Sequence, residues 1–175
     1  LKDAAGNFFA NIPQCTRKDL RNAVEAAAKA GPGWAKRTAY NRGQIIYRLG
    51  EMIEARADEM AAALVLGGAS KVAAAREVAA TVDRLIYYAG WTDKYEQVLG
   101  NVNPVAAPYF NFTVTEPMGI VGVLAPEESP LLALVSLFAP AITSGNAVVA
   151  LASTSQPYPA ILLGEMLATS DLPGG

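Results

Sequence analysis

Two adjacent carboxylates, Glu127 and Glu128, follow an apolar run that ends at Ala125, and they are the side chains best placed for chemistry. Ligands of open α/β sheets bind beyond the carboxyl ends of strands, so the pair could act as a general acid and base. However, adjacent side chains tend to point apart, and Ser129-Pro130 is typical of a helix N-cap followed by proline. Carboxylates are also stabilised near a helix N-terminus. We therefore favour a structural role for both carboxylates.

Thiol and imidazole chemistry is limited by composition, because the sequence has one cysteine, Cys15, and no histidine. An intrachain disulfide, a cysteine metal cluster, a zinc site and a histidine-dependent triad are therefore excluded. Cys15 precedes Thr16, the predicted cap of the first helix, and is interpreted as an inert structural thiol. No metal site is predicted.

The chain is 52% hydrophobic and 17% charged, with a net charge of −2, which disfavours nucleic acid and anionic lipid as partners. Its longest apolar run, residues 131–142, is too short to span a bilayer and contains Pro140. No charged and apolar leader precedes it, so a soluble, cytoplasmic protein is predicted. Because the chain starts at Leu1 without Met and stops within a repeating pattern, we expect it to be a piece of a longer polypeptide.

Residues 1–100 are predicted to be mainly helical, because apolar residues recur there at three- and four-residue spacing. The first helix is expected to begin at Thr16 and to end at Gly31-Pro-Gly33, since these residues interrupt helices. Further helices are predicted over residues 38–56, 60–66 and 70–95. The last should bury a stripe composed of Val72, Val78, Val82, Leu85, Ile86 and Ala89.

Residues 101–118 show a different period, and within them residues 108–115 alternate as an exposed strand or hairpin arm would. One face is predicted to carry Tyr109, Asn111, Thr113 and Thr115, and the other Phe110, Phe112 and Val114. Aromatic and β-branched side chains on both faces predict a surface that pairs with a partner.

Residues 119–175 alternate between apolar strands and helices, which indicates two βα units of a parallel sheet. Strands are predicted at 120–125 and 147–152, with helices from Pro130 and over 158–170. Gly119 and Gly122 do not form the Gly-x-Gly-x-x-Gly pattern of dinucleotide-binding turns. The predicted fold class is α/β, with N-terminal helices, the first βα units of a Rossmann-like parallel sheet and a protruding strand.

Four spaced segments resemble the aldehyde dehydrogenase superfamily in both their residues and their order: Tyr87-Tyr-Ala-Gly-Trp-Thr-Asp-Lys-Tyr95, Glu116-Pro-Met-Gly119, Ala125-Pro126 followed by Pro130, and Gly145-Asn-Ala-Val-Val149. The resemblance covers nearly the whole chain. It implies a partial cofactor-binding domain over residues 1–175, an oligomerisation strand within 101–118, and NAD(P) as the family's cofactor. It also implies that the family's catalytic domain, with its nucleophilic cysteine and general-base glutamate, is absent from this chain.

The resemblance implies a lost catalytic residue. The family reads Ala-Pro-Trp-Asn-Phe-Pro where this chain reads Ala125-Pro-Glu-Glu-Ser-Pro130, so Glu128 occupies the position of the asparagine that donates to the oxyanion. Such a donor contributes about 3 kcal/mol, whereas an ionised carboxylate can only accept. A protonated Glu128 could donate, but it would need a strongly raised pKa, so this rescue is disfavoured. No catalytic residue is predicted in this chain.

The cofactor-binding positions implied by the resemblance are altered as well; they are Ala125, Pro126, Leu151, Ser153 and Thr154. The family reads Val-Val-Leu-Lys-Pro-Ser-Glu where this chain reads Val148-Val-Ala-Leu-Ala-Ser-Thr154. Leu151 replaces the lysine, Thr154 replaces the glutamate, and only Ser153 is retained. Each lost charged hydrogen bond is worth about 1.5–3 kcal/mol, so no cofactor is expected for this chain.

The sequence therefore predicts a degenerate aldehyde dehydrogenase-like module with a structural or oligomerisation role, similar to the non-catalytic second module of tandem-domain aldehyde dehydrogenases. Its predicted partner is a second copy or another such module, contacted through residues 109–115. The alternative is a fragment of an active NAD(P)-dependent aldehyde dehydrogenase or related reductase, whose catalytic cysteine would lie beyond residue 175.

Overall fold

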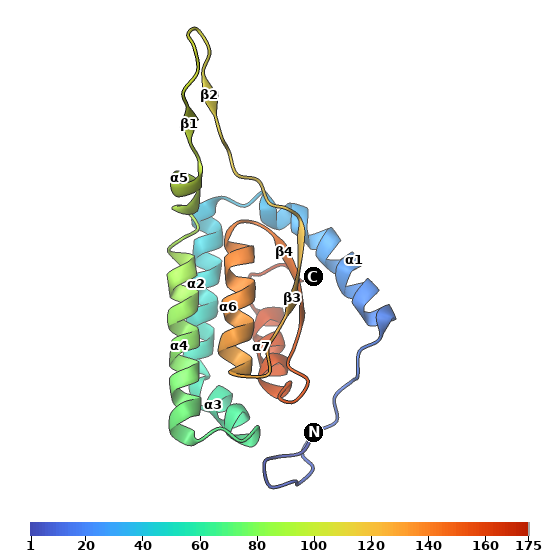
Figure 1. The fold of residues 1–175 in the computed structure, drawn as a ribbon. Helices are drawn as coiled ribbons and strands as arrows, with labels where there is room; N and C mark the ends of the chain where they lie inside the picture. The colour runs from blue at the N-terminus through green and yellow to red at the C-terminus, as the bar shows by residue number, and fades with distance from the viewer. Residues whose placement is uncertain (175) are drawn as a thin grey trace.

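The computed structural model describes residues 1–174 and confirms the α/β class (Figure 1). A helical half is followed by a long hairpin arm and then by a two-stranded parallel sheet with its helices. In chain order the elements are α1 (Arg17–Ala35), α2 (Ala39–Ala55), α3 (Ala57–Leu66), α4 (Lys71–Ala89), α5 (Tyr95–Leu99), β1 (Val102–Asn103), β2 (Asn111–Phe112), β3 (Ile120–Leu124), α6 (Pro130–Thr143), β4 (Ala147–Leu151) and α7 (Tyr158–Thr169).

Helix α1 starts as predicted but continues further than expected. The Asp19 carboxylate accepts hydrogen bonds from the Thr16 amide at 2.7 Å and the Thr16 hydroxyl at 2.8 Å, which fixes the first turn. The predicted end at Gly31-Pro-Gly33 is wrong, because the helix includes Pro32 and runs to Ala35. Trp34 is buried, and its Nε1 donates to the Ile142 carbonyl at 2.9 Å. This tertiary anchoring offsets the cost of about 3 kcal/mol for an interior proline.

Helix α4 is the centre of the helical layer, where it packs against α2, α3 and α6. Val78, Val82 and Leu85 are buried as predicted, whereas Val72 and Ile86 are exposed. The helix also ends at Ala89 and not near residue 95, because the chain turns at Gly90 before α5 begins. The spacing thus identified the right helix but assigned its apolar face too widely.

The parallel sheet pairs β3 with β4 in a continuous register from Ile120↔Ala147 to Leu124↔Leu151. Helix α6 is the crossover that parallel strands require, and α1 contacts the sheet from its other side (Figure 1). Gly145 adopts a φ of +87°, which favours glycine, in the turn between α6 and β4. Next to it, the Asn146 side-chain oxygen accepts from the Gly119 amide at 3.0 Å and fixes the start of β3. Both predicted βα units are confirmed.

The arm is a hairpin that projects away from the helical layer and the sheet (Figure 1). Its antiparallel ladder is short, pairing Val102 with Phe112 and Asn103 with Asn111. The strand predicted over 108–115 is therefore regular only at residues 111–112, although an exposed hairpin arm is what the alternation indicated.

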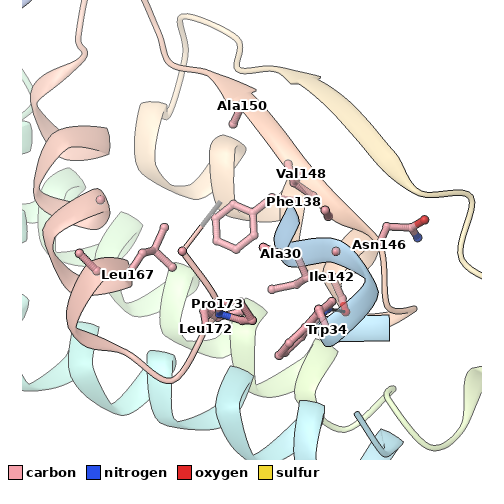
Figure 2. A pocket seen from close by; sticks show the side chains of 15 residues that line it. Ala30, Trp34, Phe138, Ile142, Asn146, Val148, Ala150, Leu167, Leu172 and Pro173 are labelled. Atoms are coloured by element: carbon pink, nitrogen blue, oxygen red, sulfur yellow. Dashed lines mark hydrogen bonds between the residues drawn. The ribbon is translucent and has the colours of Figure 1, made fainter. Parts of the chain in front are cut away.

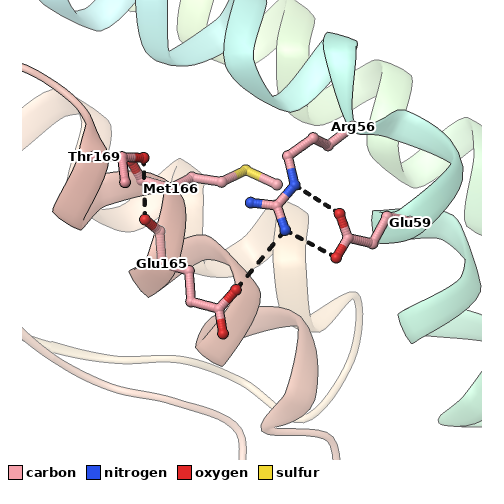
Figure 3. Close-up of polar contacts among 5 residues, drawn as sticks. All are labelled: Arg56, Glu59, Glu165, Met166 and Thr169. Atoms are coloured by element: carbon pink, nitrogen blue, oxygen red, sulfur yellow. Dashed lines mark hydrogen bonds and ion pairs between the residues drawn. The ribbon is translucent and has the colours of Figure 1, made fainter.

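An ion-pair cluster connects the α2–α3 junction to α7 (Figure 3). The Arg56 guanidinium bonds both oxygens of Glu59, at 2.6 and 2.8 Å, and lies 3.8 Å from a carboxylate oxygen of Glu165 on α7. The hydrogen bond to Glu59 raises the pKa of Arg56 and lowers that of Glu59. Because these groups are solvent-exposed, the cluster contributes to orientation more than to stability.

The most apolar segment, residues 131–142, lies in α6 and packs against α4 and the sheet. Its buried side chains belong to the main core, together with those of α2, α3, α4 and α7. Among residues 1–174, none of the helices combines the length and the apolar character needed to cross a bilayer.

Two neighbouring residues of α4 test this assignment of the core. Leu85→Ala is expected to lower the free energy of unfolding by about 2–5 kcal/mol, because Leu85 is 0% exposed and its removal leaves a cavity. Ile86→Ala is the matched control, since Ile86 is 41% exposed, and its effect should stay below about 1 kcal/mol. Urea unfolding of the intact protein measures both values, and equal losses would contradict the assignment.

Candidate functional site at the carboxyl edge of the sheet

The loops after β3 and β4 lie side by side, because the two strands are parallel and end in register at Leu124 and Leu151. The Ala125 amide extends this pairing by donating to the Leu151 carbonyl at 2.9 Å. The structure therefore brings the predicted positions of both loops to one edge of the sheet, where α/β proteins bind ligands. This edge is the candidate site.

The Glu127 carboxylate crosses from the first loop to the second and binds it at several points. Its Oε2 accepts from the Ser153 hydroxyl at 2.6 Å, from the Ser155 amide at 2.9 Å and from the Ser155 hydroxyl. Its Oε1 accepts from the Thr154 amide at 3.0 Å. The loop after β4 thus surrounds one carboxylate with two backbone amides and two hydroxyls.

These donors stabilise the ionised form of Glu127. The Ser153 hydroxyl has the largest effect, followed by the hydroxyl and amide of Ser155 and the amide of Thr154, and together they lower the pKa of Glu127 to about 2. A carboxylate held in this form is a poor general acid at neutral pH. The acid/base alternative for Glu127 and Glu128 therefore gains no support from the geometry.

Glu127 and Glu128 were expected to be stabilised by the N-terminus of α6, but the carboxylate that binds this helix end comes from another helix. Ser129 lies at the N-cap position but has a left-handed φ of +50° and makes no capping bond with its side chain. The capping group is Glu77 of α4, whose Oε1 accepts from the amides of Leu131 at 3.0 Å and Leu132 at 3.2 Å. The predicted N-cap position of Ser129 and the proline that follows it are confirmed, but the capping bonds come from Glu77 and not from the Ser129 side chain.

The remaining predicted positions offer little polar chemistry. Leu151 is exposed and lies opposite Leu124, which is also exposed, so the last pair of the ladder presents two apolar side chains. Glu128 is exposed as well. Only Ser153, among the positions of the second loop, is buried, and its hydroxyl is engaged by Glu127.

We did not predict from the sequence that Ser155 donates hydrogen bonds to Glu127, or that the Glu127 side chain points to the loop after β4. A usable signal was present in the alternation Ser153-Thr-Ser155 directly after a strand, because hydroxyl and amide donors in such a loop suit a carboxylate. What the sequence did not contain was the pairing register, which decides that the loop after β3 faces these donors.

A separate apolar pocket of about 370 Å³ lies between α1, α6, β4 and α7 (Figure 2). Its walls include Trp34, Phe138, Ile142, Val148 and Leu167, and the segment at Leu172 and Pro173 borders it. The side chains drawn in Figure 2 are almost all apolar, with Asn146 at the margin. This pocket lies apart from the loops at the carboxyl edge.

Cys15 is a free and exposed thiol, so its interpretation as an inert structural thiol gains no support from burial. Within residues 1–174, no group of three or more His, Cys, Asp and Glu side chains is arranged to share a metal ion. Neither feature adds a reactive group to the candidate site.

Comparison with known proteins identifies the family. The sequence matches the aldehyde dehydrogenase family over residues 1–175, and the chain belongs to that family. An aldehyde dehydrogenase from Alternaria alternata is 36% identical over 178 residues, covering 100% of this chain and 35% of that protein. The chain thus spans about a third of the length of the curated relatives that it matches.

Solved structures agree with this assignment. A putative aldehyde dehydrogenase from Burkholderia cenocepacia superposes with a TM-score of 0.94 at 30% identity, covering 99% of this chain and 35% of that one. A betaine aldehyde dehydrogenase variant from Staphylococcus aureus, solved in complex with NAD+, has a TM-score of 0.90 at 24% identity, covering 97% and 34% of the two chains. At that identity the likeness concerns the fold alone.

The Glu127 contacts predict a pH-dependent contribution to stability. Because the folded-state pKa of about 2 lies below the ordinary value of 4.5, the contribution is complete above about pH 4.5 and is lost as the pH falls through about 2. Glu127→Gln should therefore lower the thermal midpoint at pH 7, and the difference from the parent protein should shrink between pH 4.5 and 2.

Glu128→Gln is the control for this titration, because Glu128 is a neighbouring exposed carboxylate. Thermal unfolding of the intact protein followed by circular dichroism at several pH values measures the effect. A Glu127→Gln difference that does not change over this range would contradict the assigned contacts.

Proposed function

We propose that this chain is a structural module of an aldehyde dehydrogenase-family protein, which presents its arm to a second module or copy and itself carries out no catalysis. The observation that carries the proposal is the exposed apolar surface of the arm. Tyr109, Phe110, Phe112 and Val114 are all more than half exposed, although they lie within six residues of one another. Such clusters mark protein–protein interfaces.

The backbone of the arm supports the same role. Its ladder involves two residues from each strand, so other amides and carbonyls of the hairpin remain at an open edge. An edge of this kind can add a strand from a partner, with the aromatic side chains supplying specificity. The rings of Phe110 and Phe112 also pack together, with centroids 5.5 Å apart, which presents them as one apolar unit.

The base of the arm is held by a buried cation. Arg42 of α2 donates from Nε to the Thr143 carbonyl at 3.2 Å and from Nη1 to the Arg37 carbonyl at 2.6 Å. Its Nη2 lies 3.4 Å from the Tyr95 hydroxyl in α5, the helix that leads into the arm. Fixing the direction of an interaction element lowers the entropy lost on docking.

The residues at the carboxyl edge do not fit NAD(P) as a ligand. The resemblance puts Leu151 and Thr154 at positions where the family has a lysine and a glutamate, and Leu151 can make no hydrogen bond with its side chain. The amide of Thr154 and both donors of Ser155 are engaged by Glu127. A carboxylate at this point would also repel a phosphate. These observations support a module without a cofactor of its own.

The second candidate is a part of an active NAD(P)-dependent dehydrogenase whose catalytic cysteine lies outside these residues. It is favoured by relatives such as those from Alternaria alternata and Sus scrofa, which are named as aldehyde dehydrogenases and are about three times as long as this chain. A cysteine with a nearby carboxylate base in the rest of the polypeptide would support this candidate. The cytoplasmic location and the lack of a nucleic-acid partner stay predictions from the sequence.

Two exposed tyrosines test the role of the arm. Tyr109→Asp should reduce the assembled fraction, because Tyr109 is 77% exposed on the arm and a charge there opposes burial in an interface. Tyr40→Asp on α2 is the matched control at 72% exposure and should leave assembly unchanged. Sedimentation velocity of the intact protein measures both variants, and equal effects would argue against an arm-mediated interface.

Calorimetric titration tests the cofactor proposal. NAD+ and NADP+ are expected to bind the parent module with a Kd of about 1 mM or weaker. The Leu151→Lys/Thr154→Glu variant restores the two side chains that the family has at these positions. It should bind at least about tenfold more tightly, since each charged hydrogen bond contributes about 1.5–3 kcal/mol. Micromolar binding by the parent module would favour the second candidate.

A further inference from the structure

The loop at residues 153–155 has the geometry of a small anion-binding site. Four donors converge on one carboxylate: the hydroxyls of Ser153 and Ser155 and the amides of Thr154 and Ser155. Successive backbone amides that point in one direction form a concave nest, which binds anions without requiring a cation. Among residues 1–174, no Lys or Arg forms an ion pair with the carboxylate held there.

The nest is constructed from a buried polar residue and not only from surface groups. Ser153 is 3% exposed, and its hydroxyl lies 2.6 Å from the Glu127 carboxylate. The same hydroxyl oxygen accepts from the Gln156 amide at 3.0 Å, which leaves its hydrogen directed at the carboxylate. This bond within the loop helps to hold the Ser153 hydroxyl in place.

The occupant of the nest comes from a different part of the chain. Glu127 follows β3, whereas the donors follow β4, and 26 to 28 residues separate the bonded groups. The contact is therefore tertiary, and Glu127 relates to the nest as a ligand relates to its site. The register of the sheet supplies the high local concentration that keeps this ligand bound.

We infer that the 153–155 nest is a binding site for a carboxylate-type oxyanion and that Glu127 is its built-in occupant, closing the carboxyl edge of the sheet to external anions. The inference goes beyond the proposed assembly role and does not depend on it. Removing the Glu127 side chain should open the site to a small free carboxylate, for which acetate is the matching probe.

Glu127→Ala tests this by chemical rescue. In the intact protein, this variant should have a lower thermal midpoint than the parent, and added acetate should raise the midpoint in a saturable manner, as expected for a ligand that binds only the folded state. Sodium chloride at the same ionic strength should not produce the rise. The parent protein and Glu128→Ala are the controls, and acetate should affect them no more than chloride does.

The position of the bound acetate is tested by NMR. Acetate should shift the amide resonances of Thr154 and Ser155 in Glu127→Ala and leave them unchanged in the parent protein. A Glu127→Ala variant that also carries Ser153→Ala and Ser155→Ala lacks both hydroxyl donors, and it should lose most of the acetate response. A response that survives in this variant would overturn the assignment of the nest.

Two further results decide the proposal. An acetate effect that is equal in Glu127→Ala and Glu128→Ala would show general salt stabilisation and would overturn it. Should Glu127→Ala not fold in chloride, refolding in acetate is expected to recover it, and failure in both salts would count against the nest as an anion site.

Discussion

The parallel pairing of β3 with β4 is the constraint on which the candidate site depends. Parallel strands need a crossover, and α6 supplies it while burying the longest apolar run of the chain. The start of the pair is fixed by the bond from the Gly119 amide to Asn146, and its end by the bond from the Ala125 amide to the Leu151 carbonyl. A slip of one residue would turn the strand side chains to the opposite face and shift the two loops relative to each other.

The site at this edge is organised around an internal anion. In a sheet of this kind, the loop donors face outward to receive a ligand, but here the Glu127 carboxylate occupies them. The low pKa of Glu127 follows from the same four donors. The hydrogen bonds that position this carboxylate in the loop therefore also keep it ionised. The exposed Leu124 and Leu151 beside it offer no polar replacement. The four hydrogen-bond donors of residues 153–155 are therefore bound by a carboxylate of the same chain.

The arm and the helical layer are coupled through buried polar contacts and not only through apolar packing. Among residues 1–174, no carboxylate forms an ion pair with the buried Arg42, which donates to two carbonyls and to the Tyr95 hydroxyl. The Thr143 carbonyl lies at the C-terminal end of α6, where a cation is favourable. The residue thus joins α2, α6 and α5, and it places the base of the arm relative to the sheet.

The sequence by itself determined the elements that depend on local spacing and on motifs. It predicted α2 through Ile45, Ile46 and Leu49, both βα units, and the family through segments such as Gly145-Asn-Ala-Val-Val149. From the resemblance it also predicted that Glu128 and Leu151 replace an asparagine and a lysine of the family, a prediction that rests only on the order of residues.

Only the tertiary structure decided the features in which a long-range contact overrides a local sequence preference. Helix α1 passes through Pro32 because Trp34 is anchored on Ile142, 108 residues away. Glu77 caps α6 in place of Ser129 because α4 packs against that helix, and Glu127 binds residues 153–155 because the strands pair in register. Each outcome depends on a contact between residues distant in sequence, whose energy exceeds the local preference and is not encoded in local spacing.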